Sequence, residues 1–567
     1  MRSVFLPRLS DLSVFRVLTW LVCAGLVFLT IYPLGFIGYA VSGLEGSSGT
    51  VGNVLREMVS GEAMRLLGTT SGLVGTATVG ALAIGAILAW LNERTDARVG
   101  WISDVMPVLP MLVPPVAGAV GWAFLGSPIA GFLNHWLDRA GSLVGYDPPA
   151  INIFSWPGLA FVYTIFLVPY AYVSLAAGFR SIEPSMEEAA RVSGAGSLEI
   201  FRRVTLPSLG PSIGGAVLLL VAMGFALYSA PTIIGTIQDI DVLSVSVVQA
   251  MTLQFPADIE RAVGQSLLLV LVVALAWIAQ RKLSFGRGHA TISGRGRATS
   301  PMKLGGLRRV AQAFMFGYVA LTVVLPSIAL LIVALQPFWT AQIDWGSLSL
   351  DGIRTVFSRP TLRDSMFNSV WLGVVVASIL MIIAAIVSVA VLQRRSRLGS
   401  FIDGVTKVPA AVPNIIIAVA FVLAFAGSPF YWGSTFTILI LAYVLVYFPH
   451  AAVNANAAFL QVGPRLREAA AVAGASQGEV FRRILLPLMV PGLSAGWAFV
   501  FVLVAGDLNV AVLLASTGTP VSGAVMLDLY TTGTYADVAA LSVLSTIVTM
   551  SVVVTTLVLA KRSSTRQ

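Results

Sequence analysis

The chain has 567 residues, of which 57% are hydrophobic and only 11% are charged, and its mean hydropathy is +0.88. These values exclude an ordinary soluble domain and predict a protein that resides in the lipid bilayer. The net charge of +9 does not indicate a nucleic-acid partner, because the basic residues gather in loops between apolar runs and there report membrane topology.

Apolar runs of the roughly 20 residues needed to cross about 30 Å of hydrocarbon recur along the whole chain. They lack the alternating pattern of barrel strands, so we expect an all-α transmembrane protein of about 12 helices. Six spans are expected in the first half, near residues 17–41, 67–91, 105–125, 157–178, 211–232 and 262–280. Six more are expected in the second half, near residues 311–336, 367–392, 409–427, 436–458, 488–510 and 538–560.

The amino-terminal stretch MRSVFLPRLSDLSVFR is basic and precedes an apolar run too long for a signal-peptide core, so we expect a retained first span. Cys23, the one cysteine, lies in this span. A disulfide within the chain and a Cys-based metal cluster are therefore excluded, and we expect no metal site.

The distribution of basic residues predicts the topology. With both termini in the cytoplasm, the loops assigned to the outer side hold only seven of the 35 Lys and Arg residues, namely Arg56, Arg65, Arg139, Arg261, Arg354, Arg359 and Arg363. This bias follows the positive-inside rule. The linker from Arg281 to Arg309 holds eight positive residues and no acidic ones, which is typical of a cytoplasmic tether near anionic membrane lipid.

The chain repeats its most polar segment. EEAARVSGAGSLEIFRRVTLP, residues 187–207, returns as REAAAVAGASQGEVFRRILLP, residues 467–487, at an offset of 280. Farther upstream, PVLPMLVPP resembles KVPAAVPN at an offset of 299, so the first half carries extra residues, which we place in 127–156. Both segments fall on the cytoplasmic side, so two six-span units share one orientation.

Each repeated segment predicts a short helix that ends at a glycine, with small alanines that let another backbone approach and with charges at its rim. The following Arg-Arg pair lies at the membrane surface, and the proline marks the start of the next span. The pattern predicts a cytoplasmic docking site in each half.

The two segments resemble the EAA loops of the inner-membrane permeases of binding-protein-dependent ABC importers with the type I fold. The resemblance implies coupling helices that seat in clefts of ATPase subunits, within loops 181–211 and 461–491. The residues that carry it are Glu188, Ala189, Ala190, Gly194, Glu468, Ala469, Ala470 and Gly474. We expect a first permease unit at 1–285, a linker at 286–308 and a second unit at 309–567.

The fused, two-unit form resembles the ferric-iron and thiamine permeases in particular. It implies a bacterial inner-membrane location, two copies of a cytoplasmic ABC ATPase and a periplasmic or lipid-anchored substrate-binding protein. Ferric iron is the expected solute, and thiamine, an organophosphonate or another small polar solute are the alternatives.

The energy for transport is expected to come from ATP hydrolysis by a separate protein. All four lysines (Lys282, Lys303, Lys407 and Lys561) are preceded by a residue other than glycine, so the chain has no Gly-Lys of a phosphate-binding loop. We therefore expect no enzymatic activity and no cofactor in this chain, with ATP and Mg²⁺ bound by the partner ATPases. Closure of the two ATPase subunits on ATP would turn one six-span unit against the other, which would open the pathway alternately to each side of the membrane.

Two other classes are less well supported. A secondary transporter driven by an ion gradient would carry carboxylates or histidine relays in its spans, but the acids almost entirely avoid them here. A channel would show a ring of selectivity-filter residues, which is not evident here, and a channel would not explain the two docking loops.

The expected pathway residues are Asp507, Asn509 and Tyr228. Asp507 lies near the outer end of its span, where it could face a cation or be a solvated carboxylate at the interface. Leu227 holds the equivalent position in the first half, which departs from the iron-permease pattern. His135 and His450 are expected to be structural, and the prolines of the third and ninth spans are expected to distort those helices.

Overall fold

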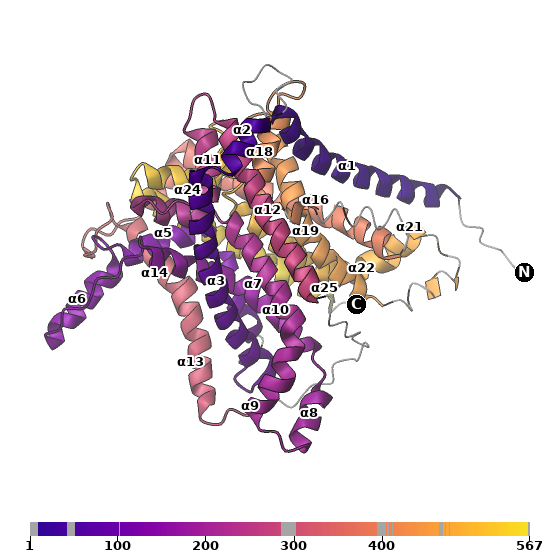
Figure 1. The fold of residues 1–567 in the computed structure, drawn as a ribbon, viewed down its shortest axis with the longest axis horizontal. Coiled ribbons are helices and arrows are strands. Elements are labelled where there is room, and N and C mark those ends of the chain that lie inside the picture. The colour runs from indigo at the N-terminus through magenta and orange to yellow at the C-terminus, as the bar shows by residue number, and fades with distance from the viewer. Residues whose placement is uncertain are drawn as a thin grey trace, which may run out of the picture. The chain divides into compact units, whose positions relative to one another are not determined.

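The computed structural model describes residues 9–41, 51–100, 102–284, 302–393 and 404–564, apart from 405–407, 411, 464–465, 467–468, 471, 474 and 476 within the last range. The described residues form helices and one isolated parallel bridge, between Thr95 and Met302, and no strand (Figure 1). The expected all-α class is confirmed.

The described residues of the first half form sixteen helical elements. They are α1 (Leu9–Val41), α2 (Val51–Met58), α3 (Gly61–Arg94), α4 (Ile102–Val105), η1 (Met106–Leu112), α5 (Pro115–Gly126), α6 (Phe132–Val144), α7 (Trp156–Ser181), α8 (Pro184–Val192), α9 (Ser197–Ile200), η2 (Phe201–Thr205), α10 (Leu206–Ala226), η3 (Pro231–Gly235), η4 (Thr236–Gln238), α11 (Leu243–Thr252) and α12 (Ile259–Ser284).

The second half repeats this order among its described residues. Its elements are α13 (Leu307–Val319), η5 (Ala320–Val324), α14 (Leu325–Leu335), α15 (Asp351–Ser358), α16 (Pro360–Gln393), α18 (Asn414–Phe425), α19 (Phe436–Gln461), α21 (Gln477–Val480), η6 (Phe481–Leu485), α22 (Leu486–Ala505), α23 (Ala511–Leu514), α24 (Ser522–Thr531) and α25 (Tyr535–Ser564).

The helices preserve both sequence offsets. α7 and α19 each have 26 residues and start 280 positions apart, whereas α3 and α16 each have 34 residues and start 299 positions apart. The helix α6 falls inside 127–156, the stretch in which the extra residues of the first half were placed. The internal repeat therefore extends from the polar segments to the membrane helices.

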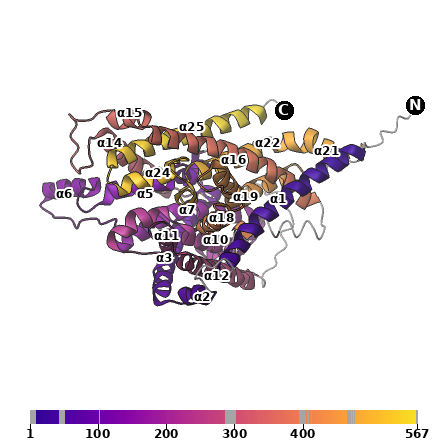
Figure 2. The same ribbon diagram turned by 90° about the horizontal axis from the view of Figure 1, so that it is seen from above.

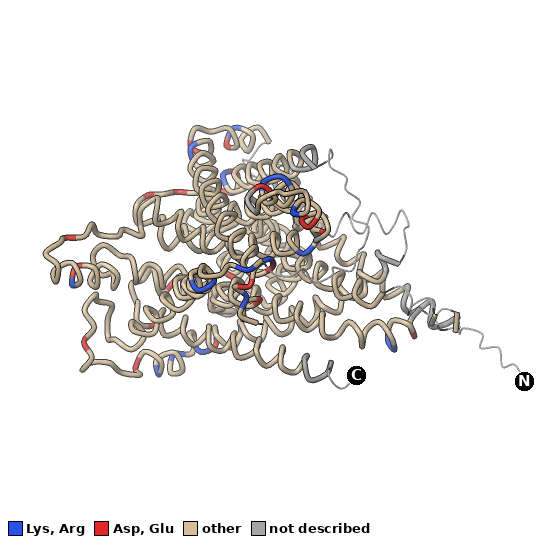
Figure 3. Tube along the Cα trace, turned by 90° about the horizontal axis from the view of Figure 1, so that it is seen from below, with Lys and Arg blue, Asp and Glu red and all other residues tan. Residues whose placement is uncertain are grey.

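Ten helices in the described part of the chain are long and apolar enough to cross a membrane, or up to 12 if each of two bent pairs is one span. This agrees with the expected number of about 12. Most of the tube in Figure 3 is tan, since charged residues are sparse along these helices.

The third span, expected over 105–125 as a helix distorted by its prolines, is indeed broken. It is a pair of helices, Ile102–Leu112 and Pro115–Gly126, bent by 86°. The prolines at 107, 110, 114 and 115 remove backbone N–H donors and restrict the preceding residues to extended conformations, which explains the break. In the described residues of the ninth span, expected over 409–427, the longest helix is α18, with 12 residues.

A second bent pair lies where no span was expected. Helical turns over Pro231–Gln238 and α11 meet at 91°. Each piece is shorter than the roughly 20 residues used to recognise a span, so a search by length misses them.

Contacts divide the chain into two compact units. Unit 1 contains residues 1–54, 356–528 and 544–567, and unit 2 contains residues 55–355 and 529–543. Unit 1 therefore joins α1 to the helices of the second half, where α1 packs on α18 and α19, as Figure 2 shows. The ring centroids of Tyr32 in α1 and Phe425 in α18 lie 5.5 Å apart.

In unit 2, the first helices of the second half pack on the first half. α14 contacts α5, where a Cβ added at Gly121 would lie 2.9 Å from the carbonyl oxygen of Pro326. The end of the linker is joined to the loop after α3, because Met302 N donates to the Arg94 carbonyl (2.9 Å) and Asp96 N donates to the Met302 carbonyl (3.1 Å). The packing units thus exchange the first helices of the two sequence repeats.

Candidate functional site

The first polar segment forms α8, which starts with a proline and ends at a glycine. Gly194 has φ +87°, Ala195 N donates to the Ala190 carbonyl (3.1 Å), and Gly194 N donates to the Arg191 carbonyl (3.0 Å). This is a Schellman ending, in which a left-handed residue satisfies the last carbonyls of the helix. Glycine is favoured there because a Cβ strains a positive φ.

The second polar segment has the same turn in its described residues. Ala475 N donates to the Ala470 carbonyl (3.1 Å) and Ala473 N donates to the Ala469 carbonyl (3.0 Å), each 280 positions after its first-half counterpart. Glu468 and Gly474 lie outside the described residues.

The two segments expose matching side chains. Met186 and Val192 are 51% and 88% exposed, and their counterparts at the offset of 280, Leu466 and Val472, are 51% and 91% exposed. Single exposed apolar residues are ordinary, but the same pair in both repeats indicates a shared contact surface. Glu188 and Ala189 are exposed beside Met186, and Ala190 is half-buried.

The opposite side of the second segment is packed. Ala470 belongs to a buried cluster of unit 1 with Phe459 of α19, Leu485 of η6 and Met489 of α22. A small residue at Ala470 lets the segment lie close to these helices, whereas Ala469 remains exposed. The segment therefore connects a solvent-facing surface directly to membrane helices.

Asp507 lies in the turn between α22 and α23 and is 6% exposed. The Tyr447 hydroxyl of α19 donates to its Oδ1 (2.7 Å), and Val510 N (2.9 Å) and Ala511 N (3.2 Å) donate to its Oδ2. Asp507 therefore binds the backbone at the start of α23 and ties this turn to α19. A solvated carboxylate at the interface, one of the two expected alternatives, does not fit this burial.

The hydrogen bond between Tyr447 and Asp507 was not predicted from the sequence. Tyr443 and Tyr447 are four residues apart in α19 and share one face of that helix, and this spacing was the available signal. The imidazole of His450 lies 6.1 Å from the Tyr447 ring between centroids, and its Nδ1 has no hydrogen-bond partner among the described residues.

The first half builds the equivalent turn without a carboxylate. The Leu227 carbonyl accepts hydrogen bonds from the Ser244 hydroxyl (2.7 Å) and the Tyr163 hydroxyl (3.5 Å). Tyr228 is 4% exposed and lies in unit 2, whereas Asp507 and the half-buried Asn509 lie in unit 1.

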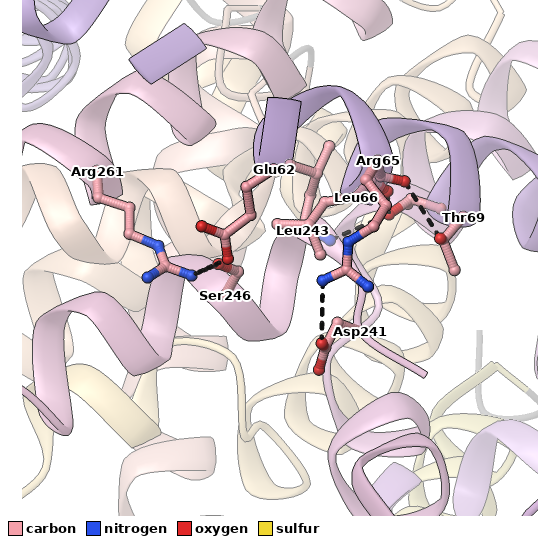
Figure 4. Close-up of polar contacts among 9 residues, drawn as sticks. Glu62, Arg65, Leu66, Thr69, Asp241, Leu243, Ser246 and Arg261 are labelled. Atoms are coloured by element: carbon pink, nitrogen blue, oxygen red, sulfur yellow. Dashed lines mark hydrogen bonds and ion pairs between the residues drawn. The ribbon is translucent and has the colours of Figure 1, made fainter. Parts of the chain in front are cut away.

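A polar network in unit 2 fixes the bent pair to α3 (Figure 4). Arg261 Nη2 lies 2.6 Å from Glu62 Oε1 and 3.1 Å from the Ser246 hydroxyl, and Arg65 Nη2 lies 3.6 Å from Asp241 Oδ2. The sequence assigned both arginines to the outer side without predicting this network.

Backbone contacts complete the anchoring of the bent pair. Leu243 N donates to the Thr70 hydroxyl (3.0 Å), and in unit 1 Ser522 N likewise donates to the Ser369 hydroxyl (2.8 Å). Both repeats therefore hold the start of a short helix, α11 or α24, on the long helix α3 or α16.

No group of three or more His, Cys, Asp or Glu residues that could hold a metal ion occurs in the described part of the chain.

The family model for the inner membrane component of binding-protein-dependent transport systems matches residues 81–283 and 382–566. The ferric transport system permease protein FbpB of Actinobacillus pleuropneumoniae is 22% identical over 548 residues, which cover 93% of this chain and 75% of the relative. The Fe(3+)-transport system permease protein FbpB 2 of Haemophilus influenzae is 24% identical and covers 80% of this chain and 81% of the relative.

More distant similarities cover about half of the chain or less. The spermidine/putrescine transport system permease protein PotC of Haemophilus influenzae is 23% identical over 39% of this chain and 86% of the relative. A bacterial alginate ABC transporter, solved in complex with an alginate pentasaccharide-bound periplasmic protein, has a TM-score of 0.40 and 18% identity, covering 48% of this chain and 97% of that chain.

The family match covers both repeats and together more than half of the residues. The chain belongs to the family of inner-membrane components of binding-protein-dependent transport systems, as an ABC importer permease with multiple membrane spans.

Proposed function

We propose that two copies of a separate cytoplasmic ABC ATPase dock on the two polar segments and that their closure on ATP drives import through this permease. The observation that carries this proposal is the repeated polar segment, whose described residues show equivalent backbone hydrogen bonds and an equivalent exposed apolar pair in both halves. Glu188, Ala189, Ala190 and Gly194 form the first docking site. Glu468, Ala469, Ala470 and Gly474 form the second.

The continuity of the helices supports a mechanical route. Only Ile182 and Glu183 separate α7 from α8, and the residues that follow α8 lead through α9 and η2 into α10. A displacement of α8 is therefore passed to two membrane helices, which is what alternating access by a rigid-body movement requires.

We propose ferric iron as the solute. Support comes from the two ferric permeases, each matched over at least 80% of this chain. Import of thiamine, an organophosphonate or another small polar solute is the alternative, since the polyamine relative shows that similar chains are named for other cargoes.

The inward orientation of both termini is also proposed, on the strength of the seven arginines left on the outer side. A substrate-binding protein, periplasmic or lipid-anchored, is then proposed to deliver the solute to that side. The family description supports such a partner.

Asp507, Asn509 and Tyr228 are proposed to lie at the pathway. Each belongs to the turn after α10 or α22, where a membrane helix ends. The carboxylate of Asp507 already accepts at least three hydrogen bonds, so a passing cation would have to replace one of those donors.

Co-purification tests the docking proposal. The ATPase encoded with this permease should co-purify with the wild-type chain and should be lost from a variant with Glu188→Arg and Glu468→Arg, because both changes reverse the charge of the docking surface. Glu260→Arg, at the start of α12, is the matched control and should retain the ATPase.

Uptake in proteoliposomes separates this proposal from a secondary transporter. Radiolabelled ferric iron should enter only with the binding protein, the ATPase and ATP present, and an ionophore should leave the rate unchanged. Uptake without the ATPase that collapses with an ionophore would contradict the proposal.

A further inference from the structure

The last residue of α3 holds the first docking helix in place. The side chain of Arg94 is only 9% exposed, and its Nη2 donates to the carbonyls of Phe179 (2.9 Å) and Ile182 (3.3 Å) at the end of α7. Its Nη1 lies 3.5 Å from Oε2 of Glu187 in α8. One guanidinium therefore joins α3, the end of α7 and the docking helix.

Glu187 connects this guanidinium to the next membrane helix. Its other oxygen, Oε1, accepts a hydrogen bond from the Thr205 hydroxyl (2.9 Å) in η2, which runs directly into α10. Glu187 is 19% exposed and points inward, while its neighbour Glu188 is exposed. The two adjacent acids therefore have different surroundings.

Two further contacts fix the same corner of unit 2. Arg180 Nη2 lies 2.5 Å from Oε1 of Glu93, beside Arg94, and the Arg94 carbonyl accepts from Met302 N at the end of the linker. We call Arg94, Glu187 and Thr205 the clasp. The contacts around it join α3, α7, α8, η2 and the linker.

The sequence of the second repeat lacks the partners of the clasp. At the offsets of 299 and 280, its positions hold Gln393, Arg467 and Leu485 instead of Arg94, Glu187 and Thr205. Leu392 and Leu460 replace the ion pair of Glu93 and Arg180. All five polar positions have changed, whereas the Glu-Ala-Ala and Arg-Arg positions of the two segments are identical.

We propose that Arg94 and Glu187 are positioning residues that lock the first docking helix to α3, α7 and α10, and that the first repeat alone carries this lock. It rests on the proposed function, since it concerns how the movement of the ATPase at α8 reaches the membrane. A half-buried, charge-assisted contact resists movement of α8 relative to its neighbours, so the helix and the membrane bundle move as one body. The two docking sites are then mechanically unequal.

The test measures solute imported per ATP hydrolysed by the intact permease with its ATPase and binding protein in proteoliposomes. Glu187→Gln removes the carboxylate that faces Arg94, and we expect this ratio to fall at least about fivefold, the lower end of typical coupling between sites. Thr205→Val removes one hydrogen bond and should cause a smaller fall. Binding of the ATPase, measured by co-purification, should not change.

A double variant separates positioning from stability. Arg94→Met with Glu187→Met removes both charges together, so neither charge is left buried without its partner, and the protein should melt closer to the wild-type temperature than either single variant does. The coupling ratio should nevertheless stay low, because the lock is absent. Glu183→Gln is the matched control at the start of the same helix, where the side chain is exposed, and it should couple as wild type does.

The outcomes distinguish the two proposals. Wild-type coupling in both Glu187→Gln and the double variant would overturn the lock while leaving the docking proposal intact. A wild-type chain that neither binds the ATPase nor requires ATP would overturn the docking proposal and the lock with it.

Discussion

At the scale of single residues, the position of Asp507 suggests a role in cation transport, whereas its contacts suggest a structural role. An acid near the end of a membrane helix could meet a cation, but this one is 6% exposed and accepts hydrogen bonds from Tyr447, Val510 and Ala511. Those donors hold the carboxylate against the start of α23. Its structural task can therefore be tested separately from its proposed place in the pathway.

Asp507→Ala should destabilise the protein markedly. The change leaves one hydroxyl and two backbone N–H groups buried without an acceptor, at a cost of about 1–3 kcal/mol for each group. The expected result is a thermal transition in detergent lowered by several degrees, measured by tryptophan fluorescence. Asn509→Ala, in the same turn but half-buried, is the control and should melt close to wild type.

Iron uptake by the Asp507→Asn variant then tests whether Asp507 contributes to the translocation pathway. Asparagine keeps the shape of the side chain but carries no charge. If stability is largely retained while iron uptake falls at least about tenfold, the charge itself acts on the cargo. Unchanged uptake would leave Asp507 with a structural role alone.

At the scale of elements, each docking helix depends on how it ends. In α8 the left-handed Gly194 lets the backbone turn back and satisfy the carbonyls of Ala190 and Arg191. No atom lies within 4 Å of a Cβ built there, so a side chain would meet strain in the backbone and no clash. Substitution should therefore shift the end of α8 without disturbing the membrane helices.

Gly194→Val should uncouple ATP hydrolysis from uptake. A β-branched residue at φ +87° costs on the order of 1–3 kcal/mol, which is enough to favour a different end for so short a helix. Insertion into the membrane should be normal, and the import per ATP should fall. Gly196→Val is the matched control, because Gly196 has open space and no positive φ; equal effects of the two changes would argue against the role of the turn.

At the scale of the whole molecule, the sequence repeats and the packing units differ. Unit 1 needs α1 to cover α18, and unit 2 needs α14 to cover α5, so each unit takes its first helix from the other half of the sequence. A continuous half of the chain therefore leaves an apolar helix face uncovered. The fused arrangement places both partners in one polypeptide and fixes their ratio.

Fragments divided between residues 285 and 301 should test this exchange. We expect residues 1–290 and 291–567 to be retained together when they are co-expressed and affinity-purified through one tag. Each fragment alone should be degraded, since it lacks the helix that its unit requires. Two fragments that are separately stable and do not co-purify would contradict the exchanged packing.

The fold was largely predictable because membrane spans can be recognised in a sequence by their length and apolar character. The straight spans and the repeat followed directly from composition and spacing, and prolines in 105–125 indicated a distorted third span. The pair at 231–252 escaped prediction because two short helices bent by 91° do not satisfy a test for one long run. Length is informative only where a helix crosses the bilayer in one piece.

The polar segments were predictable as a motif, but their internal contacts were not. Glu187 and Glu188 are adjacent and chemically identical, and only the fold decides that one faces Arg94 while the other faces solvent. Likewise, the local sequence around Asp507 does not predict its contact with Tyr447, which lies 60 residues earlier.

The sequence alone determined that the chain is a helical membrane protein, that it consists of two repeats and that each repeat carries the same polar segment. Hydrophobic length, charge bias and repetition are local properties of a chain, so they can be counted without a structure. The tertiary structure decided which helices pack together, that Asp507 is buried and bound by Tyr447, and that Arg94 ties α8 to α3 and α7. Those features join residues far apart in sequence, and the free energy that fixes them comes from packing and hydrogen bonds that exist only in the folded protein.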